Sequence, residues 1–173
     1  YSVAYRTASG VWRDIHAPGD ATPPGTLAVW QTPEMDGPVV LRIVADDRVG
    51  RSAEVALTVR VDNIAPVATV STPTADSQVA GVVEIVGSAT DEHFSSYSVE
   101  WSSGAVGSAA GWVPIVTDVA AAVEEGRLAT WDSGGTSGPV RLRLTVEDAA
   151  GHATVSETSV IVAGVLRSEL HAS

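Results

Sequence analysis

The chain contains no cysteine among its 173 residues, and phenylalanine and methionine occur once each. Without cysteine, the chain can form neither a disulfide framework nor a cysteine-based metal site. Aromatic residues make up 5% of the chain, although hydrophobic residues make up 45%. The apolar share is therefore mostly Val, Ala, Leu and Ile, and the abundant Val and Thr favour strands over helices. Sixteen glycines and nine prolines supply turns between short strands.

Positively charged residues are also scarce, with 10 Lys and Arg against 21 Asp and Glu and a formal net charge of −11. Proteins that bind nucleic acid neutralise its phosphates with basic side chains, so we expect no nucleic-acid partner. An acidic surface suits solubility or the binding of cations. The longest apolar run, residues 160–166, is interrupted by Gly164 and is too short to span a bilayer. We therefore expect no membrane insertion.

One sequence pattern occurs twice in the chain. Residues 25–63 return without a gap as residues 126–164, and about a third of the positions are identical. A repeat of this kind indicates an array of one small structural unit. The hexapeptide at residues 61–66 stands between the two copies. We expect a partial repeat at residues 1–63, a complete repeat at 64–163 and a C-terminal tail at 164–173.

Alternating apolar residues predict antiparallel strands with one buried face in both copies. The strongest strands are residues 39–45 and 140–146, each followed by a glycine-containing turn and a return strand. Residues 26–30 and 127–131, which both end in Trp, are expected to form a further pair of equivalent strands. The inward stripe of the strongest strand in the second copy is predicted to be Val140, Leu142, Leu144 and Val146.

The last strand of the second copy changes its pattern partway. Val155 lies on one parity of the alternation, and Val160 and Val162 lie on the other. A one-residue shift of register would move every apolar side chain to the other face. We therefore expect a β-bulge between Ser156 and Ser159.

The first copy lacks a counterpart of residues 65–87, which are predicted to open the second copy with two strands. Without these strands the first copy would expose an apolar groove and open strand edges, which pair readily with other chains. Two explanations are open. Either Tyr1 follows further residues in a longer parent protein, or a neighbouring copy supplies a strand by complementation, with the tail as the natural donor.

Four segments carry a family resemblance: VDNIAP at residues 61–66, YSV at 97–99, GRLATWD at 126–132 and LRLTVEDAAG at 142–151. Together they resemble the tandem immunoglobulin-like (Ig-like) repeats, similar to fibronectin type III modules, of large secreted and cell-surface bacterial proteins. The resemblance covers nearly the whole chain except the tail. It implies an all-β fold of two tandem Ig-like antiparallel β-sandwiches, the first lacking its first two strands.

The same resemblance implies a non-catalytic, extracellular segment at a bacterial surface. Such repeats act as spacers, stalks or fibre-forming and adhesive modules, and their partners are neighbouring repeats or copies of the same protein. The alternative is a carbohydrate-binding accessory module of a secreted hydrolase, which would recognise surface polysaccharide through exposed Trp. The sandwich by itself is compatible with unrelated functions.

The tryptophans recur at matching places, with Trp12 corresponding to Trp112 and Trp30 to Trp131. Repetition in both copies is what a shared core requires, and large aromatic residues dominate small cores. Exposed rings would instead favour sugar stacking. The predicted core and structural residues of the second copy are Tyr97, Trp101, Trp112, Trp131, Leu142 and Leu144.

Acidic residues near the joint are candidate ligands for Ca²⁺, which takes six to eight oxygen atoms. In an Ig-like sandwich, the loop after the second strand and the last hairpin turn lie at the end where the domain begins. The candidate ligands are Asp62, Asn63, Asp91, Glu92 and Asp148. Asp and Asn are also common in turns because they cap their own backbone, so a calcium-stiffened joint and plain turn capping both remain open.

No catalytic residues are predicted. The chain has no Gly-x-Ser-x-Gly elbow, and it has no glycine-rich phosphate loop or HExxH motif. Asp148 with His152 could form half of a catalytic triad, but the pair also fits a solvated hairpin turn. We therefore expect the protein not to be an enzyme.

Overall fold

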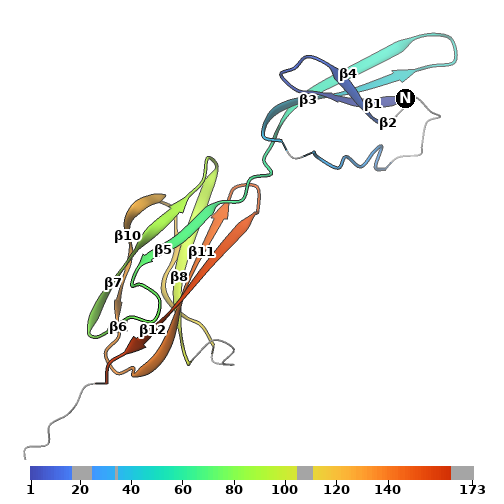
Figure 1. Cartoon of the computed structure of the whole chain (residues 1–173). Helices are drawn as coiled ribbons and strands as arrows, with labels where there is room; N and C mark the ends of the chain where they lie inside the picture. The colour runs from blue at the N-terminus through green and yellow to red at the C-terminus, as the bar shows by residue number, and fades with distance from the viewer. Residues whose placement is uncertain (17–24, 34, 105–110, 165–173) are drawn as a thin grey trace, which may run out of the picture. The chain divides into compact units, whose positions relative to one another are not determined.

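The structure, a computed structural model, describes residues 1–16, 25–33, 35–104 and 111–164 (Figure 1). All regular elements in these residues are β-strands, which confirms the predicted all-β class. The chain divides into two compact units, Tyr1–Ile64 and Ala65–Ser173, called unit 1 and unit 2 below. The tail expected after the second repeat lies outside the described residues except for Gly164.

The strands follow one another in chain order. Unit 1 contains β1 (Ser2–Arg6), β2 (Trp12–His16), β3 (Gly37–Asp46) and β4 (Ser52–Val61). Unit 2 contains β5 (Val67–Thr72), β6 (Gln78–Val79), β7 (Val82–Thr90), β8 (Phe94–Ser103), β9 (Val113–Val119), β10 (Val123–Asp132), β11 (Gly138–Asp148) and β12 (Ala153–Val162).

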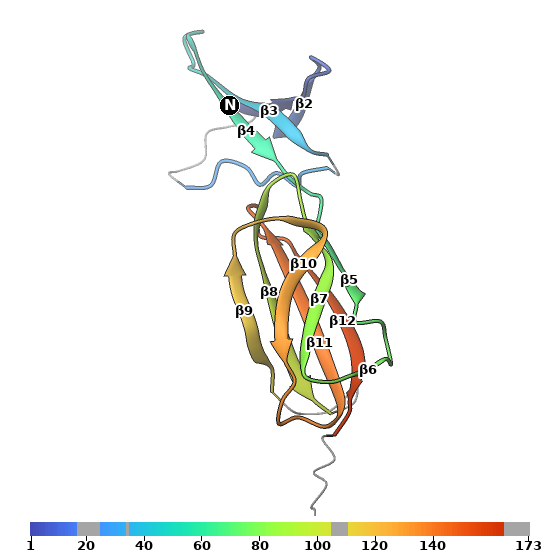
Figure 2. The same ribbon diagram turned by 90° about the vertical axis from the view of Figure 1, so that its left-hand side faces the viewer.

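Unit 2 is built from two sheets, one with the strand order β10-β7-β5 and the other with the order β6-β12-β11-β8-β9. Neighbouring strands are antiparallel except β6 and β12, which run parallel. The two sheets face each other, as Figures 1 and 2 show. Five of the seven connections between successive strands of unit 2 cross from one sheet to the other, whereas β8–β9 and β11–β12 join neighbours within one sheet.

The core of unit 2 lies between these two sheets and takes side chains from both. Ile85 of β7 and Leu142 and Leu144 of β11 are fully buried. Tyr97 of β8 crosses between the layers, and its hydroxyl donates a 2.7 Å hydrogen bond to the carbonyl oxygen of Leu128 in β10. Burial raises the pKa of Tyr97, so the hydroxyl remains a donor and joins the two sheets inside the core.

Strand β12 is regular along its whole length, so the predicted β-bulge between Ser156 and Ser159 is wrong. Its ladder with β11 contains no register shift. Val160 and Val162 face the core, whereas Val155 lies on the outer face and is 54% exposed. The alternation of apolar residues changes along β12 because the inward positions in the first half of the strand are polar, as at Ser156. The backbone register itself does not shift.

Unit 1 forms one sheet with the strand order β2-β1-β3-β4. The same order recurs in unit 2 as β9-β8-β11-β12, and the sequence repeat maps β3 onto β11 and β4 onto β12. Unit 1 is therefore the counterpart of one sheet of the unit 2 sandwich. The described part of unit 1 contains no counterpart of β5 or β7, the two strands predicted to be missing.

The strand predicted at residues 26–30 does not form, although its counterpart at residues 127–131 lies within β10. In unit 2, β10 has β7 as its hydrogen-bonding neighbour in the sheet. A strand needs a neighbour that satisfies its backbone N–H and C=O groups. Because the described residues of unit 1 include no counterpart of β7, residues 26–30 have the side-chain pattern of a strand without the pairing.

A matched pair of core truncations tests this difference between the units. We expect Leu142→Ala to destabilise unit 2 by about 2–5 kcal/mol, the usual range for a fully buried Leu. Leu41 is its counterpart in unit 1 but is only partly buried, so Leu41→Ala should cost less than about 2 kcal/mol there. Denaturant unfolding followed through NMR signals of each unit measures both. Equal losses of unfolding free energy for the two variants would mean that Leu41 and Leu142 are equally well buried, which would contradict this difference.

Candidate functional site

Three of the acids expected to bind calcium lie at one end of unit 2. Asp91 and Glu92 lie in the turn between β7 and β8, and Asp148 is the last residue of β11. The backbone N–H of Ala149 donates a 2.8 Å hydrogen bond to the carbonyl oxygen of His93, which connects the two turns. This is also the end at which β5 begins, because its first residues pair with the last residues of β7.

The Asp148 carboxylate is enclosed by its own hairpin turn, and its side chain has 0% exposed surface. Its Oδ1 accepts 2.8 Å hydrogen bonds from the backbone N–H groups of Ala150 and His152. Its Oδ2 lies 2.7 Å from Nδ1 of His152. Burial raises the pKa of Asp148, but hydrogen bonds from the His152 backbone and ring and from the turn backbone lower it by more, so the net pKa lies below its usual range. Asp148 is therefore a charged carboxylate that closes the turn.

The repeat shows that this carboxylate closes its turn with or without a histidine. Asp47 is the counterpart of Asp148, and its Oδ1 accepts 2.9 Å hydrogen bonds from the backbone N–H groups of Val49 and Arg51. Arg51 occupies the position of His152. The bond between Asp148 and His152 is formed, but the shared feature of the two copies is the turn. This recurrence favours a structural role over half of a catalytic triad.

Asn63 fastens the loop before β3 to the end of β4 within unit 1. Its side-chain amide nitrogen donates a 2.9 Å hydrogen bond to the carbonyl oxygen of Pro33. Its backbone N–H donates a 2.8 Å hydrogen bond to Oδ1 of Asp36, and Oδ1 of Asp62 accepts a 3.3 Å bond from the backbone N–H of Ile64. These are the backbone-capping bonds expected of Asn and Asp in turns. Calcium binding by the acids of the two units stays a prediction.

Trp112 lies on the outer face of its sheet, whereas the sequence favoured a place in the core. The centroid of its indole ring lies 4.1 Å from the guanidinium carbon of Arg143 and 4.8 Å from that of Arg141. In unit 1, the Trp12 ring lies 4.1 Å from the guanidinium carbon of Arg42 in the same way. The same cation–π contact is therefore formed in both copies, and such a contact is worth about 0.5–2 kcal/mol.

The alternation along β11 could have placed Trp112 correctly. Leu142 and Leu144 point into the core, so Arg141 and Arg143 must point to the opposite face. An aromatic residue that recurs together with an outward Arg indicates a stack on the outer surface. The other predicted core residues, Tyr97, Trp101, Trp131, Leu142 and Leu144, belong to the core cluster or pack against it.

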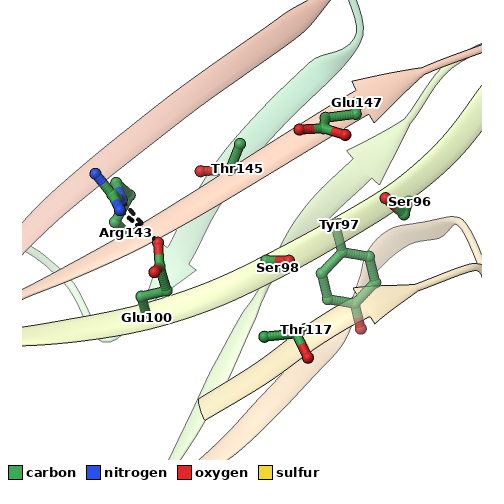
Figure 3. Close-up of a pocket in the computed structure, with 8 residues that line it drawn as sticks. All are labelled: Ser96, Tyr97, Ser98, Glu100, Thr117, Arg143, Thr145 and Glu147. Atoms are coloured by element: carbon green, nitrogen blue, oxygen red, sulfur yellow. Dashed lines mark hydrogen bonds and ion pairs between the residues drawn. The ribbon is translucent and has the colours of Figure 1, made fainter. Parts of the chain in front are cut away.

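A shallow polar groove lies on the outer face of unit 2, along β8 and β11, with a volume of about 290 Å³ (Figure 3). At one end, Arg143 donates from Nη2 and Nε to Oε2 of Glu100 at 2.6 and 2.9 Å. Glu147 lies at the other end (Figure 3). Hydroxyl groups line the groove, from Ser96, Ser98, Thr117 and Thr145. The alternation along β11 puts Arg143, Thr145 and Glu147 on the face opposite Leu142 and Leu144, but it does not reveal a groove.

The groove could form hydrogen bonds to a polar ligand, but it lacks an open aromatic platform. The Trp112 ring is stacked on Arg143. Trp101 and Trp131 lie against each other with ring centroids 5.7 Å apart, and Trp30 lies 4.8 Å from Tyr5. All five tryptophans thus contact a neighbouring ring or guanidinium group, and Trp131 is also buried in the core.

Comparison with known proteins adds no assignment. No family model matches the chain, and no curated protein matches it. Among the described residues, no helix has the length and apolar character needed to cross a membrane.

Removing the turn carboxylates tests their structural role. We expect Asp148→Ala to destabilise unit 2 by about 1–3 kcal/mol, because two backbone N–H groups lose a buried acceptor. The matched variant is Asp47→Ala in unit 1. Asp47 is exposed, so water can replace its carboxylate and the cost should be smaller. Denaturant unfolding resolved by unit measures both, and an unchanged stability for Asp148→Ala would contradict the role.

The depressed pKa of Asp148 also predicts a pH dependence. The carboxylate stabilises the folded state above its unfolded pKa, which is about 3.9. The stabilisation should therefore be lost as the pH falls from about 4 through the lower folded-state pKa. Asp148→Asn should flatten the loss of unit 2 stability over this range. Acid unfolding curves with the same slope in wild type and variant would contradict the prediction.

A double-mutant cycle tests the contact between Trp112 and Arg143. We expect Trp112→Ala and Arg143→Ala to be coupled by about 0.5–1 kcal/mol in the stability of unit 2. The cycle isolates this pair from the ion pair between Arg143 and Glu100. Glu100→Gln is the control, because it should weaken the ion pair and leave the coupling with Trp112 intact. A coupling energy of zero would mean that the stack contributes nothing.

Proposed function

We propose that the chain is a non-catalytic, extracellular segment of Ig-like repeats that acts as a spacer, stalk or fibre-forming and adhesive module at a bacterial surface. Its partners are neighbouring repeats or further copies of the same protein. The bacterial Ig-like family is part of this proposal and rests on the motifs at residues 61–66, 97–99, 126–132 and 142–151.

The observation that carries the proposal is the path of the chain through unit 2. The chain enters β5 at the end of the sandwich where β11 finishes with Asp148. It leaves β12 at Val162, which pairs with Gly138 at the opposite end of β11. Strand β11 has 11 residues, so entry and exit are separated by roughly 35 Å along the strands. A unit that enters at one end and leaves at the other lengthens a chain each time it is repeated.

The residues that resemble catalytic or sugar-binding groups support the same proposal. Asp148 closes a turn, as Asp47 does in unit 1. Trp112 stacks on an outward Arg, as Trp12 does. A feature that both copies use for folding needs no ligand or substrate to explain it.

Polysaccharide binding by an accessory module of a hydrolase is the second candidate, and the groove in Figure 3 is the observation that favours it. Hydroxyl groups and two carboxylates offer hydrogen bonds to sugar hydroxyls. The engaged tryptophans count against it, since sugar-binding surfaces use open indole faces. The spacer interpretation therefore stands first.

Pulling on the ends of the full chain tests the spacer function. We expect unit 2 to unfold in one event that lengthens the chain by about 300 Å, since extended residues span about 3.3–3.6 Å each. Leu142→Ala should lower the unfolding force. Gradual extension without such an event would contradict a mechanical role. Polysaccharide binding that is lost in Glu100→Gln would instead favour the accessory module.

A further inference from the structure

The chain changes sheets soon after it enters unit 2. Strand β5 pairs with β7 in one sheet, and β6 then pairs with β12 in the other. In the turn between them, the backbone N–H and the hydroxyl of Ser77 donate hydrogen bonds of 3.2 and 2.6 Å to the carbonyl oxygen of Thr74. Asp76 in this turn has a φ of 60°, a left-handed conformation that Asp tolerates better than most residues. The turn thus brings the entering segment of unit 2 beside its last strand.

A short parallel ladder joins β6 to β12 at the end where the chain leaves unit 2 (Figures 1 and 2). Three backbone hydrogen bonds of 2.7–2.9 Å support it. Each runs from an N–H group to a carbonyl oxygen, from Asp76 to Ser159, from Ile161 to Ser77 and from Ala163 to Val79. The ladder therefore extends slightly beyond the two residues of β6 itself.

Within the described residues, this ladder is the direct backbone link between the segment that enters unit 2 and the strand that leaves it. Strand β5 pairs only with β7, and the other neighbour of β12 is β11. Protection of an open strand edge is the ordinary use of such a pairing. The ladder begins only at Ser159, however, so it leaves the first half of the edge of β12 uncovered. Edge protection alone does not explain its position.

The direction of the strands decides how the ladder responds when the chain ends are pulled. Strands β6 and β12 both run toward the exit end. A pull on the ends draws β6 back toward the entry end and draws β12 out of the exit end, so the two strands are forced to slide past each other. In this geometry the three hydrogen bonds share the load, whereas strands peeled apart from one end lose their bonds one at a time. Forced unfolding is governed by the unfolding rate, and a link whose bonds must break together slows it.

We propose that the β6–β12 ladder is a force-bearing latch, which holds the entering and leaving segments of unit 2 together when the chain is under tension. The pairs between β5 and β7 carry the pull first, and the latch carries it once they yield. This inference rests on the proposed spacer function, because a latch of this kind matters only in a chain that is pulled through its ends.

Pulling between chosen pairs of residues tests the latch. The chain contains no cysteine, so two introduced cysteines fix the attachment points in the full chain. Handles at Ala65→Cys and Gly164→Cys lie at the entry and exit ends of unit 2 and load the latch. Handles at Ala65→Cys and Ala150→Cys both lie at the entry end and leave the latch unloaded. The second pair is the control geometry.

Removal of one hydrogen bond gives the expected effect. Ala163→Pro deletes the N–H group that donates to Val79. With handles at residues 65 and 164, the unfolding rate at constant force should rise about two- to tenfold, the range expected for one backbone hydrogen bond. With handles at residues 65 and 150, the rate should change little.

Val155→Pro is the matched control variant. Strand β12 pairs regularly with β11, so the N–H of Val155 points to the same edge of β12 as that of Ile161, at a position that the ladder does not reach. Proline is tolerated where the N–H of an edge strand faces solvent. Val155→Pro should therefore produce no difference between the two geometries.

Three outcomes would overturn the latch. The first is an unchanged rate for Ala163→Pro with handles at residues 65 and 164. The second is a rise of the same size in both geometries, which would mean a general loss of stability. The third is a geometry-dependent rise for Val155→Pro that equals the rise for Ala163→Pro. All three leave the single unfolding event of unit 2 in place and so spare the spacer function. Gradual extension of the wild type would contradict the spacer function, and the latch with it.

Discussion

The closed sandwich of unit 2 depends on the pairing of β7 with β10. A sheet with one apolar face is stable only when a second layer covers that face, and in unit 2 this layer is held together by β7, which joins β10 and β5. Around it, Ile85, Leu142 and Leu144 become fully buried. Unit 1 keeps one sheet and the hydrogen bond from Tyr1 to Leu27, but its residues 26–30 do not become a strand.

Comparison of the two copies also separates residues that serve the shared fold from residues that could serve an interaction. A residue type that recurs at the same place with the same contacts, as Asp47 and Asp148 do, serves the shared fold. Differences between the copies are the more informative places to look for interactions. Glu100, which pairs with Arg143, has Ala4 as its counterpart, and Ser156 and Thr158 have Val55 and Leu57. Because Val55 and Leu57 stand where unit 2 has Ser156 and Thr158, the core-side face of the unit 1 sheet is more apolar than the same face of unit 2.

Local sequence predicted most of the strands because alternation of apolar residues depends only on which face is buried. It failed where a non-local partner decides, as at residues 26–30, whose pairing needs a counterpart of β7. The predicted β-bulge was wrong because Val155 and Val160 lie on opposite faces of a regular strand. In the sequence, this pattern looks the same as a one-residue shift of register. Trp112 was misplaced because recurrence was equated with burial. The groove beside Arg143 combines residues from β8 and β11. Alternation along each strand does not fix the register between the two strands, so it could not predict which residues meet there.

Native-state hydrogen exchange on the free chain tests the central claim most directly. Amides that pair within a cooperative core exchange only through large openings, whereas unpaired segments exchange freely. The account predicts strong protection at residues 127–131 and little protection at residues 26–30, although the two segments are repeats of one another. Equal, strong protection of both segments would contradict it, because residues 26–30 would then be paired within unit 1 itself.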